Sequence, residues 1–134
     1  MITTIATVTV FVEDQERAKA FYTEKLGFEL INDSEMFPGA DIRWLTVAPK
    51  GCPTALTLFP MGAQWEHYRE AMGKPQCFTL HCDDIMETYR ELTAKGVRFL
   101  GEPQVQNWGS FAMLVDSEGN QIVLGQRMTK ETDE

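Results

Sequence analysis

Short stretches of alternating apolar and polar residues divide the chain into predicted strands and helices. Residues 5–14, IATVTVFVED, are rich in β-branched side chains and predict a strand that ends in two acids. The apolar spacing then becomes helical over residues 15–26, so Phe21 and Tyr22 are expected to face a core. Gly27 follows, where helices commonly end in a left-handed residue. Three further strands are predicted, one beginning at residue 28 and two covering residues 41–49 and 54–60.

The same order of elements starts again in the second half of the chain. Residues 76–84, QCFTLHCDD, predict a strand that also ends in acids, and residues 85–95 predict a helix that ends at Gly96. Strands are then predicted from residue 97 and over residues 110–116 and 121–126, with the turn SEGN before the last. At an offset of 70 residues, Thr9, Glu13 and Asp14 align with Thr79, Asp83 and Asp84. The pattern predicts an α+β protein with two βαβββ modules.

The repeat also sets the expected organisation of the chain. Module one is expected at about residues 4–60 and module two at about residues 76–126. Residues 61–75 form the predicted connector, which includes a short helix over residues 63–72. Residues 127–134 are polar and predict a frayed tail.

Composition excludes several classes of function. The chain has 134 residues, of which 43% are hydrophobic, so it can bury a core. Its net charge is −8 and no basic patch stands out, which argues against a nucleic-acid partner. No apolar run is long enough for a membrane span, and the N-terminus lacks the pattern of a signal peptide. Three cysteines without a secretion signal favour free thiols and a cytoplasmic location.

Two segments carry a resemblance to a known family. They are VTVFVEDQERAKAFYTEKLGFEL, residues 8–30, and WGSFAMLVDSEGNQIVL, residues 108–124. With the repeated βαβββ pattern, they resemble the vicinal oxygen chelate superfamily, which groups glyoxalase I, bleomycin-resistance proteins and extradiol dioxygenases. Ser117 and Glu118 stand where the family usually has Pro and Asp. The resemblance covers about residues 4–126 and implies a single domain in which two curved mixed sheets enclose a cupped pocket.

The resemblance also implies where metal ligands would lie. Metal-dependent members place one ligand on the first and one on the last strand of each module, usually His, Glu or Gln. The matching positions in this chain are Thr7, Thr57, Cys77 and Val123. Threonine is a poor neutral ligand and valine is none, whereas a catalytic zinc site needs about three protein ligands. We therefore expect no bound metal and no cofactor.

The metal-free cup is expected to bind a small molecule. Strand alternation places one set of side chains on the pocket face and leaves Val8, Val10 and Val12 to pack under the helix. Either Arg43 or Trp44 is expected to join the pocket face, and Trp108 is expected near its mouth. His81 is the candidate general acid or base. The predicted ligand-binding residues are Thr7, Thr9, Phe11, Thr57, Phe59, Cys77, Thr79, His81, Trp108, Gln121 and Val123.

Three functions remain open at this level. The first is a homodimeric binding protein that sequesters a small organic or cationic ligand, as the antibiotic-resistance branch of the family does. The second is a metal-dependent lyase or dioxygenase with a non-standard site. The third is a metal-free enzyme, such as an isomerase, that uses His81 as its base.

Overall fold

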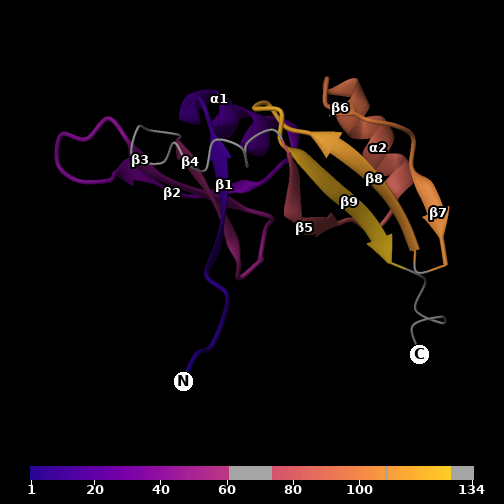
Figure 1. Ribbon diagram of the computed structural model, residues 1–134, viewed down its shortest axis with the longest axis horizontal. Helices are drawn as coiled ribbons and strands as arrows, with labels where there is room; N and C mark the ends of the chain where they lie inside the picture. The colour runs from indigo at the N-terminus through magenta and orange to yellow at the C-terminus, as the bar shows by residue number, and fades with distance from the viewer. Residues whose placement is uncertain (61–73, 108, 128–134) are drawn as a thin grey trace. The chain divides into compact units, whose positions relative to one another are not determined.

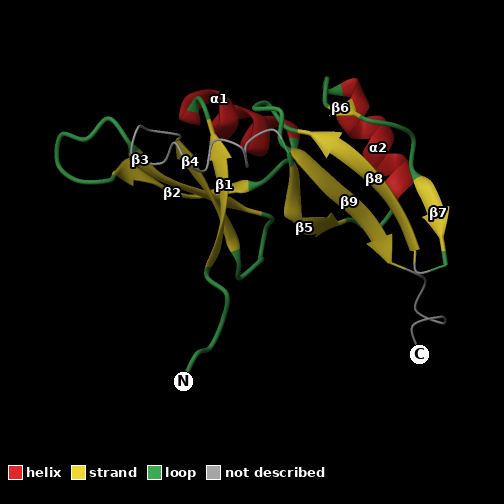
Figure 2. Ribbon diagram, viewed as in Figure 1, coloured by secondary structure: helices red, strands yellow, loops and turns green. Residues whose placement is uncertain are grey.

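The computed structural model describes residues 1–60, 74–107 and 109–127. The chain divides into two compact units, Met1–Met72 and Gly73–Glu134. Each contains a sheet with a helix against it (Figures 1 and 2). The helix expected over residues 63–72, Trp108 and most of the expected tail lie outside the described residues.

Unit 1 is built on a four-stranded mixed sheet. Its strand order is β1-β4-β3-β2, in which β1 and β4 are parallel and the other neighbours are antiparallel. A register shift interrupts the pairing of β2 with β3 between Leu30 and Asn32. The strands are β1 (Thr7–Val12), β2 (Glu29–Glu35), β3 (Arg43–Ala48) and β4 (Ala55–Pro60).

One helical segment connects β1 to β2 and packs on one face of this sheet. Helix α1 (Gln15–Ala20) begins after Asp14, whose carboxylate accepts a hydrogen bond from the Arg17 backbone N–H at 3.0 Å. The helix then widens into a π-helical turn, η1 (Phe21–Lys25), which the sequence pattern did not predict. Gly27 follows with a φ of 77°, as the helix-stop signal predicted.

The core of unit 1 lies between the sheet and this helical segment. Phe21 and Tyr22 are both buried, as expected, and the Tyr22 ring packs edge-on against Phe28 with centroids 5.7 Å apart. Alternate strand residues point toward the helical segment, which confirms the predicted burial of Val10 and Val12, while Val8 is half-buried. The fully buried strand residues of this layer are Val10, Val12, Leu45, Val47 and Leu58.

Unit 2 repeats this plan with a larger mixed sheet. Its order is β5-β9-β8-β6, with β5 parallel to β9 and with β7 paired to β8. Helix α2 packs against β9 and begins after Asp84, which accepts a hydrogen bond from the Glu87 backbone N–H. The elements are β5 (Pro75–His81), α2 (Ile85–Ala94), β6 (Arg98–Phe99), β7 (Gln104–Gln106), β8 (Gly109–Val115) and β9 (Gln121–Arg127).

A buried polar turn joins the last two strands of unit 2. Asp116 accepts hydrogen bonds from the backbone N–H groups of Glu118 and Asn120 at 2.8 and 2.9 Å. The Asn120 side chain donates a further bond to the other carboxylate oxygen of Asp116. Asp116 and Asn120 are both buried, so these bonds compensate the cost of removing them from water. They also fix the geometry of the predicted SEGN turn.

The predicted α+β class, the mixed sheets and the repeated order of elements are confirmed. Strand β7 was not predicted, because its three residues are all exposed and carry no alternating pattern. None of the described helices is long and apolar enough to cross a lipid bilayer.

Candidate functional site

The face of the unit 1 sheet opposite α1, here called the helix-free face, carries a row of polar side chains. Thr57 of β4 is paired with Thr9 of β1 on one side and with Thr46 of β3 on the other. Thr46 is in turn paired with Asn32 of β2. Residues paired across strands point to the same face. The polar row Thr9–Thr57–Thr46–Asn32 therefore runs across all four strands.

The centre of the polar row is buried and incompletely hydrogen-bonded. Thr46 and Thr57 are only 1% and 3% exposed. The Asn32 amide donates a hydrogen bond to Thr46 Oγ1 at 3.2 Å. Thr57 Oγ1 is also buried, yet it has no hydrogen-bond partner among the residues that the structure describes. Such a group is uncommon in a folded protein and calls for an explanation.

A second row, made of aromatic residues, lies beside the polar row. Phe11 of β1 is paired with Phe59 of β4, and their rings meet edge to face with centroids 6.4 Å apart. Trp44 lies two residues before Thr46 in β3, and Phe59 lies two residues after Thr57 in β4. Because β3 and β4 are antiparallel, both fall on the same side of the polar row. Phe11, Phe59 and Trp44 are here called the aromatic row. Trp44 is 38% exposed and lies beyond the paired stretch of β3 and β4, where the Gln15 amide donates hydrogen bonds to the Arg43 and Leu58 carbonyl oxygens.

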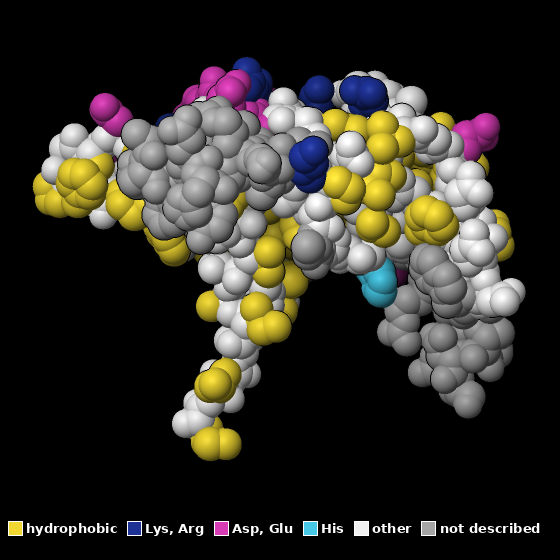
Figure 3. All heavy atoms as spheres, viewed as in Figure 1, with side chains coloured by type: hydrophobic (Ala, Val, Ile, Leu, Met, Phe, Trp, Pro, Cys, Tyr) yellow, Lys and Arg dark blue, Asp and Glu magenta, His cyan; other side chains and the backbone are white. Residues whose placement is uncertain are grey.

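The alternation resolves which residue of the Arg43–Trp44 pair shares the face of the predicted site. Arg43 points the other way, toward α1, where it forms ion pairs with Glu16 at 2.7 Å and Asp33 at 2.8 Å. Lys19 of α1 reaches the same Asp33 carboxylate at 2.7 Å. Figure 3 shows acidic and basic side chains gathered over α1.

These ion pairs shift the pKa values of the groups involved. The hydrogen bond from Arg43, followed by that from Lys19, lowers the pKa of Asp33 to about 2. The hydrogen bonds to Asp33 and Glu16 raise the pKa of Arg43 above its ordinary value. Arg43 is therefore engaged beside the helix, and the charges of this cluster are balanced against one another on that side of the sheet.

The helix-free face of unit 2 carries a more apolar set of side chains. Thr79 of β5 is paired with Val123 of β9, which is paired with Met113 of β8. One row further along, His81 is paired with Gly125, and Gly125 with Phe111. Gln121, the first residue of β9, lies on the same face as Val123. Thr79, His81, Gln121 and Val123 thus share the face that alternation predicted for them.

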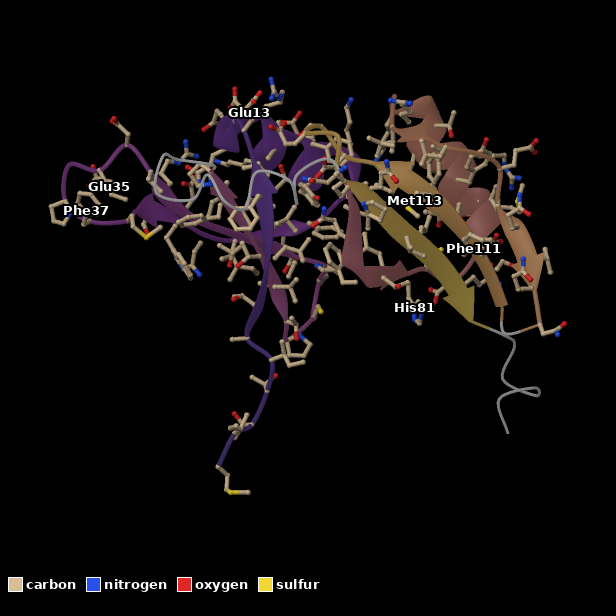
Figure 4. All side chains as sticks on the ribbon, viewed as in Figure 1. Glu13, Glu35, Phe37, His81, Phe111 and Met113 are labelled. Atoms are coloured by element: carbon tan, nitrogen blue, oxygen red, sulfur yellow. The ribbon has the colours of Figure 1, made fainter. Side chains whose placement is uncertain are left out.

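His81 stands at the end of β5, and its side chain is exposed. The ring lies over Gly125, where an added Cβ would be 3.5 Å from His81 Cδ2. Figure 4 labels it together with Phe111 and Met113 of β8, and Figure 3 shows it at the surface. Among the described residues the imidazole has no hydrogen-bond partner to hold its orientation. A catalytic base is normally oriented by such a partner.

The thiol of Cys82, the residue after His81, lies on the opposite side of the chain from the His81 ring. Cys82 is half-buried, and its Sγ lies 3.6 Å from the Gly125 carbonyl oxygen. Burial raises the pKa of the Cys82 thiol, and the nearby Asp83 and Asp84 carboxylates act in the same direction. This shift is opposite to the one that activates a thiol as a nucleophile. The Cys77 side chain, together with Trp108, lies outside the described residues, so their predicted roles stay predictions.

The donors on these strands do not fit a metal site of the kind that the family resemblance implies. Thr57 faces Thr9, while Thr7 lies one row away opposite Ala55. The corresponding pair in unit 2 is Thr79 with Val123. Hydroxyl and isopropyl groups replace the imidazoles and carboxylates that bind catalytic metals. Within residues 1–60, 74–107 and 109–127, no cluster of three or more His, Cys, Asp or Glu side chains is arranged to hold an ion.

Sequence reasoning missed several residues of these faces. Thr46, Asn32, Phe111 and Met113 were not predicted as site residues, although each follows the strand alternation. Trp44 was one of two alternatives. The missing signal is strand register, because residues from different strands become neighbours only once the pairing is known.

The sequence model of the Glyoxalase/Bleomycin resistance protein/Dioxygenase superfamily matches residues 4–124. The match therefore includes every strand of unit 1 and nearly all of unit 2.

Individual proteins are similar over almost the whole chain. YetH of Bacillus subtilis (strain 168) is 41% identical over 124 residues, covering 92% of this chain and 98% of that protein. A superfamily member from Sphaerobacter thermophilus has a solved structure with a TM-score of 0.83 and 32% identity, covering 94% and 98% of the two chains. TnmS3, described as an antibiotic binding protein from Streptomyces sp. CB03234, gives a TM-score of 0.77 and 35% identity, covering 95% and 98%.

Proposed function

Because the chain belongs to the Glyoxalase/Bleomycin resistance protein/Dioxygenase superfamily, we propose that it binds and sequesters a small organic molecule without a metal ion. The observation that carries this proposal is the composition of the helix-free face of unit 1. A row of hydroxyl and amide groups, Thr9–Thr57–Thr46–Asn32, lies beside the aromatic row Phe11–Phe59–Trp44. Apolar walls with a few placed polar groups are typical of small-molecule sites.

The similarity to TnmS3 supports binding rather than chemistry. That protein is described as antibiotic binding, and its 35% identity extends over nearly the whole of both chains. In the proposal the ligand is held by contacts with side chains and is released unchanged.

We further propose that the protein acts as a homodimer in the cytoplasm. The described cysteines Cys52 and Cys82 are free thiols, which agrees with a reducing compartment. The homodimer rests on the family resemblance, in which binding sites are commonly completed between chains. Size-exclusion chromatography with light scattering tests this part separately, and a monomeric mass at working concentrations would refute it.

The enzymatic alternatives have less support. His81 is exposed and has no described hydrogen-bond partner, so nothing among the described residues orients it as a base. A metal-dependent lyase or dioxygenase would need about three strong donors, and of the four expected ligand positions Thr7, Thr57 and Val123 supply none. Among residues 1–60, 74–107 and 109–127, no structural observation favours either alternative.

A ligand screen tests the proposal. Protein purified without chelators is titrated by calorimetry with a panel of antibiotics and other small organic compounds, with and without EDTA. We expect at least one compound to bind with the same affinity in both conditions, and mass spectrometry to recover it unchanged. Near-stoichiometric zinc, nickel, manganese or iron that is lost together with activity would overturn the proposal. Turnover that disappears in His81→Ala while binding persists would establish the metal-free enzyme instead.

A further inference from the structure

The unpartnered hydroxyl of Thr57 carries an inference about the class of ligand, which rests on the proposed function. Thr57 is only 3% exposed, and its Oγ1 has no hydrogen-bond partner among the described residues. Leaving a hydroxyl unpaired away from water costs free energy. A valine would fill the same volume in a strand at no such cost. A bound molecule that displaces the groups covering this hydroxyl would complete its hydrogen bonding.

The register places this hydroxyl at the centre of the polar row. Thr9 flanks Thr57 on β1, and Thr46 flanks it on β3. Thr46 Oγ1 already accepts a hydrogen bond from the Asn32 amide at 3.2 Å, whereas Thr57 Oγ1 has no hydrogen-bond partner among the described residues. A hydroxyl can donate one hydrogen bond and accept up to two, so it suits a ligand hydroxyl or carbonyl oxygen.

The aromatic row beside Thr57 defines the rest of the ligand. Phe59, two residues along β4, pairs with Phe11, and Trp44 lies on the same side of the row. Flat apolar rings stack on, or meet edge-on, such side chains. A ligand with a ring over these residues and an oxygen directed to Thr57 would satisfy both features.

Charge distribution argues that the ligand is neutral. The polar row and the aromatic row contain no ionisable side chain, and the ion pairs of Arg43, Asp33, Lys19 and Glu16 lie on the opposite face. Glu29, opposite Ala48, is the carboxylate that the pairing places at the far end of the face, and it is exposed. An ion buried beside Thr57 would lose its hydration without gaining a counter-charge from the described residues of these two rows. The overall charge of −8 therefore does not select a cation here.

We infer that Thr57 is the specificity-determining anchor for a neutral ring compound whose hydroxyl or carbonyl oxygen hydrogen-bonds to Thr57 Oγ1. A neutral ring compound at this site differs from the cationic ligand that the sequence left open.

Three matched probes test this inference: 2-naphthol, 2-methylnaphthalene and 2-naphthylmethylamine, which is a cation at pH 7. Each is titrated into the full chain and followed by amide chemical shifts. We expect 2-naphthol to bind about tenfold more tightly than 2-methylnaphthalene, the worth of about one hydrogen bond. The cation is expected to bind most weakly. In Thr57→Val the advantage of 2-naphthol should disappear, and in Thr57→Ser it should remain.

The control is Thr23→Val, which makes the same change where the hydroxyl donates to the Lys19 carbonyl oxygen at 2.7 Å. It should leave the ranking of the three probes unchanged. The ligand-free Thr57→Val protein should unfold at a midpoint no lower than that of the parent, because it loses no hydrogen bond. A clear fall in that midpoint would overturn the inference by showing that Thr57 has a structural bond.

The outcomes separate this inference from the function on which it rests. Equal affinity for all three probes, or a Thr57→Val protein that still prefers 2-naphthol, would overturn the ligand class and leave binding itself intact. Failure of every probe and of every compound in the wider screen would instead remove the proposed function, and the ligand class with it.

Discussion

Thr9 lies directly opposite Thr57 across the parallel pairing of β1 and β4. The family resemblance implies that metal-dependent members carry ligands on these two strands, but here two hydroxyl groups face each other. The equivalent pair in unit 2 is Thr79 opposite Val123, which offers one hydroxyl and one apolar side chain. Neither pair supplies the anionic or imidazole donors that a catalytic metal ion needs.

A metal-addition experiment follows from these two pairs. A metal that binds the folded state raises its unfolding midpoint by mass action. We expect zinc, nickel, manganese or iron(II) at micromolar concentrations to leave the thermal midpoint of the purified protein unchanged, as measured by circular dichroism. EDTA-treated protein is the reference. A midpoint that rises with added metal and saturates at one ion per chain would show that these strands do bind a metal.

The Asp33 cluster should make stability depend on pH in the acid range. Arg43 and Lys19 lower the pKa of Asp33 from 3.8 to about 2, so the folded state favours the carboxylate. The resulting stabilisation is fully present above about pH 4 and is lost as the pH falls from about 4 toward 2. We expect Asp33→Asn to cost about 1 kcal/mol at pH 7, since solvent screens part of the interaction. Urea unfolding at several pH values measures both effects.

The control for this experiment is Asp41→Asn, a change at an exposed carboxylate for which no ion pair is found among the described residues. It should alter the free energy of unfolding little at any of these pH values. If the difference between the parent and Asp33→Asn stayed constant down to pH 2, the Asp33 carboxylate could not be the source of the acid sensitivity.

The two helix caps should be equivalent in strength despite lying in different units. Asp84 accepts a hydrogen bond from Glu87 N at 3.1 Å, and Asp14 accepts one from Arg17 N at 3.0 Å. We expect Asp14→Ala and Asp84→Ala each to lower the free energy of unfolding by about 1 kcal/mol. The corresponding Asn variants should keep most of the stabilisation that the cap provides. Urea denaturation provides the measurement. Asp83→Ala is the matched control, and a loss there as large as in Asp84→Ala would mean that the cap has been misassigned.

The described cysteines should differ in reactivity. Cys52 is exposed, whereas Cys82 is half-buried, and this burial is the main reason that the pKa of its thiol is raised. Because the thiolate is the reacting form, we expect iodoacetamide at pH 7.5 to modify Cys52 well before Cys82. Peptide mass spectrometry over time measures both rates. In Cys52→Ser, modification of Cys82 should remain slow until the protein unfolds, and fast labelling of Cys82 in the folded variant would count against its burial.

Much of the fold could be predicted because the chain is locally consistent. The valines of β1, the caps at Asp14 and Asp84 and the glycines after each helical segment follow directly from residue type and spacing. Two details could not be predicted. The π-helical turn at Phe21–Lys25 has no signature in spacing, since both Phe21 and Tyr22 already fit a helical stripe. Strand β7 is a three-residue exposed edge with nothing to bury.

The candidate site could be predicted only strand by strand. Alternation placed Thr9, Phe11, Thr57 and Phe59 on one face, and the structure agrees with that alternation. What alternation does not contain is the register between strands, which brings Thr46 beside Thr57 and Asn32 beside Thr46. The unpartnered state of the Thr57 hydroxyl is a property of that neighbourhood. The missing hydrogen bond could therefore be identified only from the pairing of all four strands.

The parallel pairing of β1 with β4, and of β5 with β9, has a consequence for the order of folding. In each unit the first strand hydrogen-bonds to the last, so it has no partner in the sheet until nearly the whole unit has been synthesised. Such distant pairings are slow to form because a long loop must close first. During synthesis the valine-rich β1 therefore emerges as an unpaired edge that has to be kept from other chains until β4 follows.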